Sequence, residues 1–283
     1  MPLRLTPPTP LEYFASLVSS DADFPLLEAA VSLAQDEQPG LDVQQVLSDI
    51  DQLLVAVKCR LPQDAGGLHK LTVLNQFFYQ DLHFGGNLNN YYDPDNSYLH
   101  RVLETRRGIP ISLAVLWLEL AQGLGLNARG VGFPGHFLVK INLPQGQVVL
   151  DPLSGQSLSR EELAERIEPY RRRHEMEQGA EAPLGMFLRV SSSRDIVGRM
   201  LRNLKEIHRT QEDWGRLIAV QDRLVTLLPR AWDEVRDRGL AHAELGHVRQ
   251  ALHDLETYLF HVGQGLDVPA IAERMAELRR ALN

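Results

Sequence analysis

Helical periodicity runs along most of this 283-residue chain and is interrupted once, between residues 128 and 151. Three short strand-like runs follow one another there, at 128–132, 136–141 and 147–151. The last two flank the sequence Asn-Leu-Pro-Gln-Gly, which is typical of a hairpin turn. A buried helix followed by such a meander predicts an α+β fold with an antiparallel sheet.

The chain before this block is predicted to be helical. Residues 41–61 and 68–82 place apolar side chains at helical spacing. A further helix begins at Pro110, which suits the first turn of a helix, and ends at Gly125. Residues 85–97 are rich in Gly, Asn, Asp and Pro and are therefore predicted to form a loop.

The chain after this block is helical again. Residues 165–177 are heavily charged, which predicts a solvated helix. Beyond residue 191, residues 213–218 align with residues 247–252 at an offset of 34, and a helix pair of that period is typical of tetratricopeptide repeats. The predicted repeat helices span residues 196–209, 212–228, 232–245 and 247–261.

Composition limits the class of protein. The 29 basic and 37 acidic residues give a net charge of −8, which argues against a nucleic-acid partner. The single cysteine, Cys59, excludes an intrachain disulfide and favours a reducing, cytoplasmic setting. The proline-rich start does not resemble a signal peptide, and no apolar run approaches the roughly 20 residues of a membrane span. We expect no membrane association.

One pair of residues has the spacing of a catalytic dyad. If the hairpin is centred near Leu143 and Pro144, His136 and Asp151 lie about opposite each other on one face of the sheet. An Asp beside a His fixes the imidazole tautomer and stabilises the imidazolium. Gly135 would let a ligand approach closely. A His–Asp pair that only ties two strands together fits the same spacing.

Residues 108–152 resemble the transglutaminase-like superfamily. Its pattern is Gly-x-Cys at a helix start, then Leu-Gly-Ile-Pro-Ala-Arg, then a strand with His, then a strand ending in Asp-Pro. This chain has Leu-Gly-Leu-Asn-Ala-Arg at 124–129, then His136, then Asp151 and Pro152. Over nearly its full length the chain more narrowly resembles the bacterial SirB-type family. The stretches that carry this second resemblance are 84–87, 93–97, 108–113 and 134–137.

The resemblance implies three parts. Residues 1–82 would form a helical N-terminal segment. Residues 83–190 would form the transglutaminase-like, papain-like core of a helix plus an antiparallel sheet. Residues 191–283 would form the tetratricopeptide-like helical repeats, which add an interaction surface.

The chain departs from the superfamily at the nucleophile. Gly-x-Cys falls on Gly108, Ile109 and Pro110, and proline has no side chain that can attack a carbonyl. Ser112 is the nearby nucleophile, where a helix start and a histidine base would favour it. Two residues along a helix rotate a side chain by about 200°, however, so Ser112 is expected to face away from the position of the Cys.

We therefore predict a non-catalytic or regulatory module that binds a protein or peptide in a transglutaminase-like cleft. The predicted cleft residues are Asn87, Asn96, Pro110 and Gly135. The alternative is an atypical acyl-transfer enzyme or amide hydrolase in which Ser112 attacks, His136 is the base and Asp151 orients it, with oxyanion donors near Asn87 or Asn96. A third possibility is a scaffold in which only residues 191–283 bind.

No cofactor and no metal are expected. The chain has ten histidines, but those of the repeats contain no pair at the i, i+4 spacing that places two ligands on one helix face. They are predicted to be surface and packing residues. These histidines are His242, His247, His253 and His261.

Overall fold

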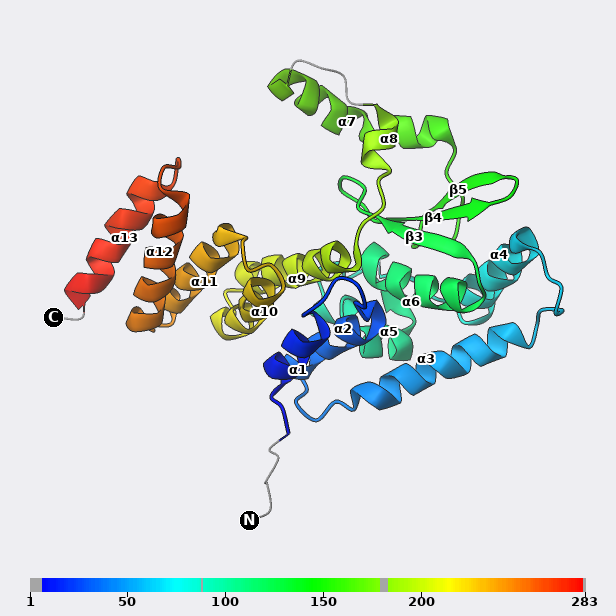
Figure 1. Ribbon diagram of the computed structural model, residues 1–283, viewed down its shortest axis with the longest axis horizontal. Helices are drawn as coiled ribbons and strands as arrows, with labels where there is room; N and C mark the ends of the chain where they lie inside the picture. Colours follow the sequence, from blue (N-terminus) through cyan, green and yellow to red (C-terminus); the bar gives the residue numbers. More distant parts are fainter. Residues whose placement is uncertain (1–6, 88, 179–182, 282–283) are drawn as a thin grey trace, which may run out of the picture. The chain divides into compact units, whose positions relative to one another are not determined.

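The computed structural model describes residues 7–87, 89–178 and 183–281 (Figure 1). The chain forms two compact units: unit 1 draws on Met1–Phe24, Gln35–Gly40 and Gly198–Asn283, and unit 2 on Pro25–Ala34 and Leu41–Val197. The strands of the described chain all lie in unit 2, and the predicted α+β class is confirmed. The division into three parts at residues 82/83 and 190/191 stays a prediction.

Unit 2 contains two small sheets. The larger one has the antiparallel order β3-β4-β5, and the smaller one is the parallel pair β1-β2. The strands are β1 (Gly85–Gly86), β2 (Arg107–Gly108), β3 (Asn127–Val131), β4 (Leu138–Leu143) and β5 (Gly146–Leu150). The helices are α2 (Leu26–Ser32), α3 (Val43–Lys58), α4 (Gly67–Asn75), the π-helical η2 (Gln76–Asp81), the short η3 (Pro94–Asn96), α5 (Leu99–Thr105), α6 (Pro110–Gly123), α7 (Arg160–Gln178) and α8 (Leu184–Phe187). The 3₁₀ turn η1 (Leu33–Asp36) follows α2.

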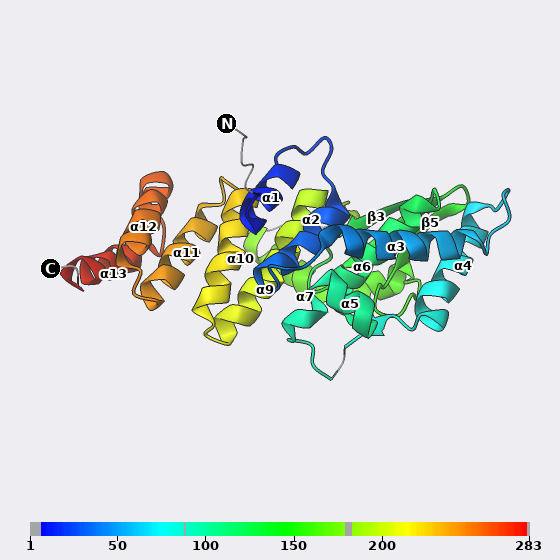
Figure 2. The same cartoon turned by 90° about the horizontal axis from the view of Figure 1, so that it is seen from below.

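Helix α6 forms the centre of unit 2. Every residue from Pro110 to Leu118 is buried, as expected for a helix that is apolar on all sides. The helix packs against α2, α3, α4 and α5 and against strands β3 and β4. Figures 1 and 2 show it next to α3 and beneath the β3-β4-β5 sheet. The start of α6 is therefore a buried position.

The hairpin register differs slightly from the prediction. Leu143 pairs with Gly146, so the centre of the turn lies one residue further along the chain than expected. Partners consequently shift by two residues, and a shift of two keeps each side chain on its face of the sheet. His136 lies two residues before β4 and Asp151 directly after β5, instead of opening and closing these strands.

The charged helix α7 is partly anchored rather than fully solvated. Leu163 and Ile167, four residues apart, are buried in a cluster with residues of β3, β4 and β5. Because side chains four apart share a face, this face of α7 is fixed to the sheet. Within the predicted range 165–177, Ile167 is therefore an exception to the expected solvation, whereas residues 165, 166, 169 and 170 are exposed as predicted.

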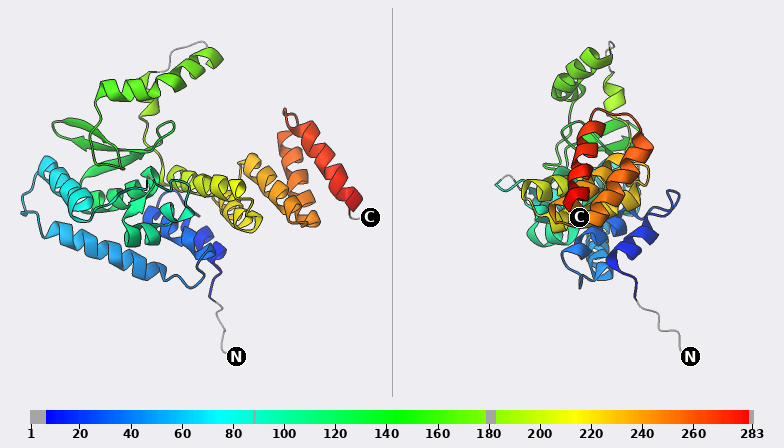
Figure 3. Two further views of the ribbon diagram at one scale, coloured as in Figure 1. Left: turned by 180° about the vertical axis from the view of Figure 1, so that it is seen from behind. Right: turned by 90° about the vertical axis from the view of Figure 1, so that its left-hand side faces the viewer.

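Unit 1 is built from helices that pack consecutively. Helix α10 contacts α1 and α11, α11 packs on α12, and α12 on α13 (Figure 3). The helices are α1 (Pro10–Leu17), α9 (Ser193–Thr210, from Gly198 on), α10 (Trp214–Leu227), α11 (Trp232–Glu244), α12 (Val248–Val262) and α13 (Val268–Ala281). The four predicted repeat helices match α9 to α12 with ends within three residues.

A buried arginine joins the N-terminal pieces of unit 1 to the repeats. Arg223 of α10 is 1% exposed and binds the Asp36 carboxylate through two N–H groups, at 2.5 and 2.9 Å. Its guanidinium also lies over the ring of Phe14. A two-pronged pair of this kind fixes geometry as well as charge.

His208 of α9 is fully buried. Neither of its ring nitrogens has a hydrogen-bond partner among the residues that the structure describes. Burial lowers the pKa of His208, opposed by the charge of Asp213 and assisted by that of Arg216. The folded protein therefore keeps this imidazole neutral to a lower pH than a free histidine.

We predict that His208 makes unit 1 sensitive to acid. Below about pH 6.5 the unfolded chain binds a proton at this residue that the folded chain excludes. The stability of the wild-type protein should fall on acidification, with a contribution from His208 of up to about 1.4 kcal/mol per pH unit. Substitution His208→Leu should remove that contribution.

Urea unfolding followed by circular dichroism between pH 5 and 8 measures the effect. His253, an exposed histidine of α12, supplies the control variant His253→Leu, which should keep the wild-type slope. If His208→Leu unfolds with the wild-type pH profile, the imidazole is not held neutral by burial.

Candidate functional site

The start of α6 is closed by a hydrogen-bonded serine. The Ser112 hydroxyl donates to the backbone carbonyl of Asn96 at 2.6 Å and accepts from the backbone N–H of Ile109 at 3.1 Å. The Ser112 side chain is fully buried. Because a hydroxyl has one proton, donation to Asn96 leaves none for a base.

A glycine makes this packing possible. A Cβ at Gly108 would lie 2.7 Å from the Ser112 Oγ, closer than carbon and oxygen can approach. Pro110 follows at the first position of the helix and is itself buried. At the position that the sequence resemblance aligns with the superfamily's nucleophile, the structure thus has a buried proline ring.

The loop before α5 is held by Asn96. This residue is 3% exposed, and its amide donates to the carbonyls of Asn90 and Tyr91 at 2.7 and 3.2 Å. Its side-chain oxygen accepts from the amide of Asn87 at 3.0 Å. These bonds satisfy the polar groups of Asn96 inside the loop, and Asn87, Asn96, Pro110 and Ser112 thus gather in one place.

The second group of predicted residues lies where the sheet meets α7. The His136 Nε2 and the Asp151 Oδ1 are 2.9 Å apart. The Asp151 side chain is 11% exposed and that of His136 is 20% exposed. The pairing expected from the hairpin is present even though both residues lie outside the strands.

Helix α7 adds two residues to this group. The Arg166 guanidinium donates to the Asp151 Oδ2 at 3.2 Å, and its side chain is 45% exposed. Tyr170, one turn further along α7, reaches over Gly135, so that a Cβ at Gly135 would collide with the phenol oxygen. Gly135 has φ of 67°, which also favours glycine.

The charge of Asp151 is well stabilised. Burial acts to raise the pKa of its carboxyl, but hydrogen bonds from His136 and the Leu153 N–H, the charge of His136 and the bond from Arg166 outweigh it. The pKa of Asp151 therefore lies below its usual range, and the carboxylate is ionised at neutral pH. The ionised Asp151 carboxylate can therefore accept hydrogen bonds from both His136 and Arg166.

A shell of polar contacts fixes the loop that carries Asp151. The Tyr79 hydroxyl, from the π-helical turn, donates to the carbonyl of Pro152 at 3.1 Å. Burial, with a contribution from the charge of Asp151, raises the pKa of Tyr79, so the phenol stays protonated. Asn75 accepts from the Trp117 indole and donates to the carbonyl of Gly155. These contacts connect the loop to α6.

Sequence reasoning missed four residues of this site. Arg166 and Tyr170 belong to a segment whose charge pattern indicates solvent exposure, while the i, i+4 pair Leu163 and Ile167 was the available signal for a buried face. Asn75 and Tyr79 lie within a predicted helix whose apolar pattern says nothing of its polar side chains. The π-helical turn that presents Tyr79 has no sequence signature, although such turns are frequent at functional sites.

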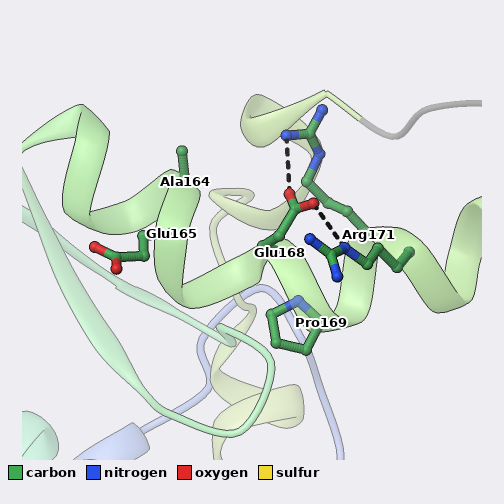
Figure 4. A pocket seen from close by; sticks show the side chains of 6 residues that line it. Ala164, Glu165, Glu168, Pro169 and Arg171 are labelled. Carbon is green, nitrogen blue, oxygen red and sulfur yellow. Dashed lines mark hydrogen bonds and ion pairs between the residues drawn. The ribbon is translucent and has the colours of Figure 1, made fainter.

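A pocket of about 730 Å³ lies along α7 (Figure 4). Glu168, which lines the pocket, forms ion pairs with both Arg171 and Arg172 of the same lining. Pro169 lies inside the continuous helix at the same place. The remaining lining residues are Ala164 and Glu165.

Within the described ranges no group of three or more His, Cys, Asp and Glu side chains is arranged to hold a metal ion. No described helix combines the length and the apolar character that crossing a bilayer requires.

Comparison with known proteins agrees with this architecture. The family described as the transglutaminase-like superfamily matches residues 44–202, and that described as the tetratricopeptide repeat matches residues 204–276. A UPF0162 protein of Xylella fastidiosa is 38% identical over 244 residues, which is 84% of each chain. A UPF0162 protein of Vibrio cholerae is 26% identical over 85% of this chain and 88% of its own length.

A shorter similarity reaches a eukaryotic protein. F-box only protein 21 of Mus musculus is 44% identical over 70 residues, which is 25% of this chain and 11% of that protein. The resemblance to the SirB-type family is confirmed, since SirB-type proteins belong to the UPF0162 family. The chain is a member of the UPF0162 family, a transglutaminase-like domain followed by tetratricopeptide repeats.

Proposed function

We propose that this protein is a non-catalytic, regulatory module that binds a protein or peptide at its transglutaminase-like site. A transglutaminase-like domain joined to tetratricopeptide repeats is itself the composition of a protein-interaction module. The observation that carries the non-catalytic part is the start of α6, where a buried proline occupies the nucleophile position. A cytoplasmic setting and the division at residues 82/83 and 190/191 are part of the same proposal.

The geometry of Ser112 supports this reading. Its proton is donated to Asn96 and its side chain has no exposed surface, so attack on a carbonyl would require breaking a buried hydrogen bond and opening the helix start. Leaving such a buried group unpaired costs about 1–3 kcal/mol. We propose that Ser112 is structural.

The His136–Asp151 pair is the observation that favours the alternative enzyme. A carboxylate on an imidazole nitrogen is the arrangement by which a catalytic histidine is oriented. Here, however, Arg166 binds the other oxygen of the same carboxylate. The Arg166 guanidinium already balances part of the Asp151 charge that would stabilise an imidazolium at His136. This favours a charge-balanced binding surface over a general base.

The exposed part of this surface can recognise a peptide. Arg166 uses one Nη atom on Asp151, and its half-exposed side chain has further N–H donors in a fixed plane. Tyr170 is 40% exposed and offers a ring and a hydroxyl beside Gly135. A planar cation next to an aromatic side chain is typical of the centre of a protein-binding site.

We predict that Ser112→Ala lowers the stability of the folded protein and has no effect on catalytic turnover. The variant should lose about 1 kcal/mol, because the Asn96 carbonyl and the Ile109 N–H lose the Ser112 hydroxyl and keep only the 3.3 Å hydrogen bond between them. Ser154 is an exposed serine in the Asp151 loop, and Ser154→Ala should leave stability within about 0.5 kcal/mol of the wild type. Urea unfolding measures both.

The same proteins should show no turnover of nitrophenyl esters or of glutaminyl peptides offered with an amine. Turnover by the wild type that is lost in His136→Ala and in Ser112→Ala, but kept in Ser154→Ala, would establish the enzyme instead.

We also predict that peptides bind next to Arg166. Peptides selected from a random display library on the immobilised full-length chain should bind Arg166→Glu at least tenfold more weakly, because reversing the charge removes the guanidinium donors. Arg172→Glu is the matched control: Arg172 lies on the same helix, is 74% exposed and pairs with Glu168 rather than Asp151.

Fluorescence anisotropy with the selected peptides gives the affinities. If the peptides bind Arg166→Glu as tightly as the wild type, the surface around Arg166 is not the binding site. If residues 191–283 alone bind the peptides as tightly as the full-length chain, the protein is a scaffold that binds only through its repeats.

A further inference from the structure

The turns after α9 and α11 have the same backbone geometry. In the second turn, Gly246 has φ of 71°. The His247 N–H donates to the carbonyl of His242 at 2.9 Å, and the Gly246 N–H donates to the carbonyl of Ala243 at 3.1 Å. This is the Schellman arrangement that ends a helix. It brings together the side chains at its two outer positions, which are five residues apart.

The first turn repeats this geometry 34 residues earlier. Glu212 has φ of 55°, and the Asp213 N–H donates to the carbonyl of His208 at 2.9 Å. The outer positions are therefore His208 and Asp213 in the first turn and His242 and His247 in the second. The offset equals the tetratricopeptide period, so the two turns are equivalent places in successive repeats.

The outer positions of the second turn bring two imidazoles together. A Schellman turn usually places apolar side chains in contact at these positions. Here the Nδ1 atoms of His242 and His247 lie 3.2 Å apart, with the ring planes inclined by 49°. The backbone bonds of the turn hold the two residues that carry these nitrogens close together.

The equivalent turn lacks this pair of nitrogens. The Asp213 carboxylate accepts from the backbone N–H of Arg216 at 3.1 Å and from its guanidinium at 3.2 Å, so it caps α10. His208 is buried in the packing. Of these two turns, only the second therefore brings two imidazole nitrogens together.

The surroundings of the second turn favour a cation. Behind His242 lie Asp222 and Asp254, bridged by Arg238, so two negative charges meet one positive charge. These three charges leave a net negative charge beside His242, which attracts a cation.

We propose that His242 and His247 form a two-imidazole site for a divalent transition-metal ion, with water completing the coordination. Zinc binds imidazole nitrogen at about 2.0–2.1 Å, and two tetrahedral ligands at that distance lie ~3.3 Å apart, close to the separation present. Imidazole suits Zn²⁺, Cu²⁺ and Ni²⁺, whereas Mg²⁺ and Ca²⁺ require oxygen ligands.

Calorimetric titration of the full-length chain with zinc chloride tests this site. His247 is exposed, so His247→Ala should fold normally, as circular dichroism can verify, and its zinc affinity should fall at least tenfold. His242→Ala should lose as much. His253→Ala removes an exposed histidine of α12 outside the pair and should stay within about twofold of the wild type.

If the two rings are joined only by a hydrogen bond, the three variants will bind zinc alike, and the proposal fails. A second measurement is independent of these substitutions. Zinc should shift the ¹⁵N resonances of both Nδ1 atoms and leave those of the exposed His253 unchanged. Zinc binding that shifts neither Nδ1 resonance would overturn the site.

Discussion

The burial of α6 is the constraint on which the transglutaminase-like unit depends. A helix start that water cannot reach must pair its polar groups within the protein. Ser112 and the Asn96 carbonyl perform that pairing, and Gly108 leaves the room for it. The same bonds that let the helix begin inside the core engage the Ser112 hydroxyl, and Pro110 has no side-chain nucleophile; both observations support the proposed non-catalytic role.

Charge at the sheet edge is organised around one carboxylate. Asp151 is buried enough to need partners, and it has them on both oxygens, from His136 on one side and Arg166 on the other. The arginine can reach it because Leu163 and Ile167 fix the first half of α7 to the sheet. Helix α7 thus forms one side of the site, and its exposed Arg166 and Tyr170 belong to the proposed binding surface.

The sequence predicted the parts of this site that depend on periodicity. A side chain's face along a hairpin depends only on parity, so His136 and Asp151 meet although the turn was placed one residue too early. Helix ends followed from Pro110 and Gly125. What periodicity cannot report is which polar side chain meets another across elements: the contact of Arg166 with Asp151 depends on how α7 packs on the sheet, and the presentation of Tyr79 depends on a local π-helical turn.

The histidine pair shows the same limit within a single turn. Searching for metal ligands at i, i+4 assumes that both lie on one helix, whereas His242 and His247 are brought together by a chain reversal five residues long. Because the helix pair repeats, this chain reversal occurs twice, at residues 208–213 and 242–247. The two turns differ in the side chains at their outer positions. In the first copy the histidine is enclosed and its partner caps a helix. In the second copy both side chains are turned toward each other at the surface, so one backbone motif supports packing in one repeat and can support ligand binding in the next.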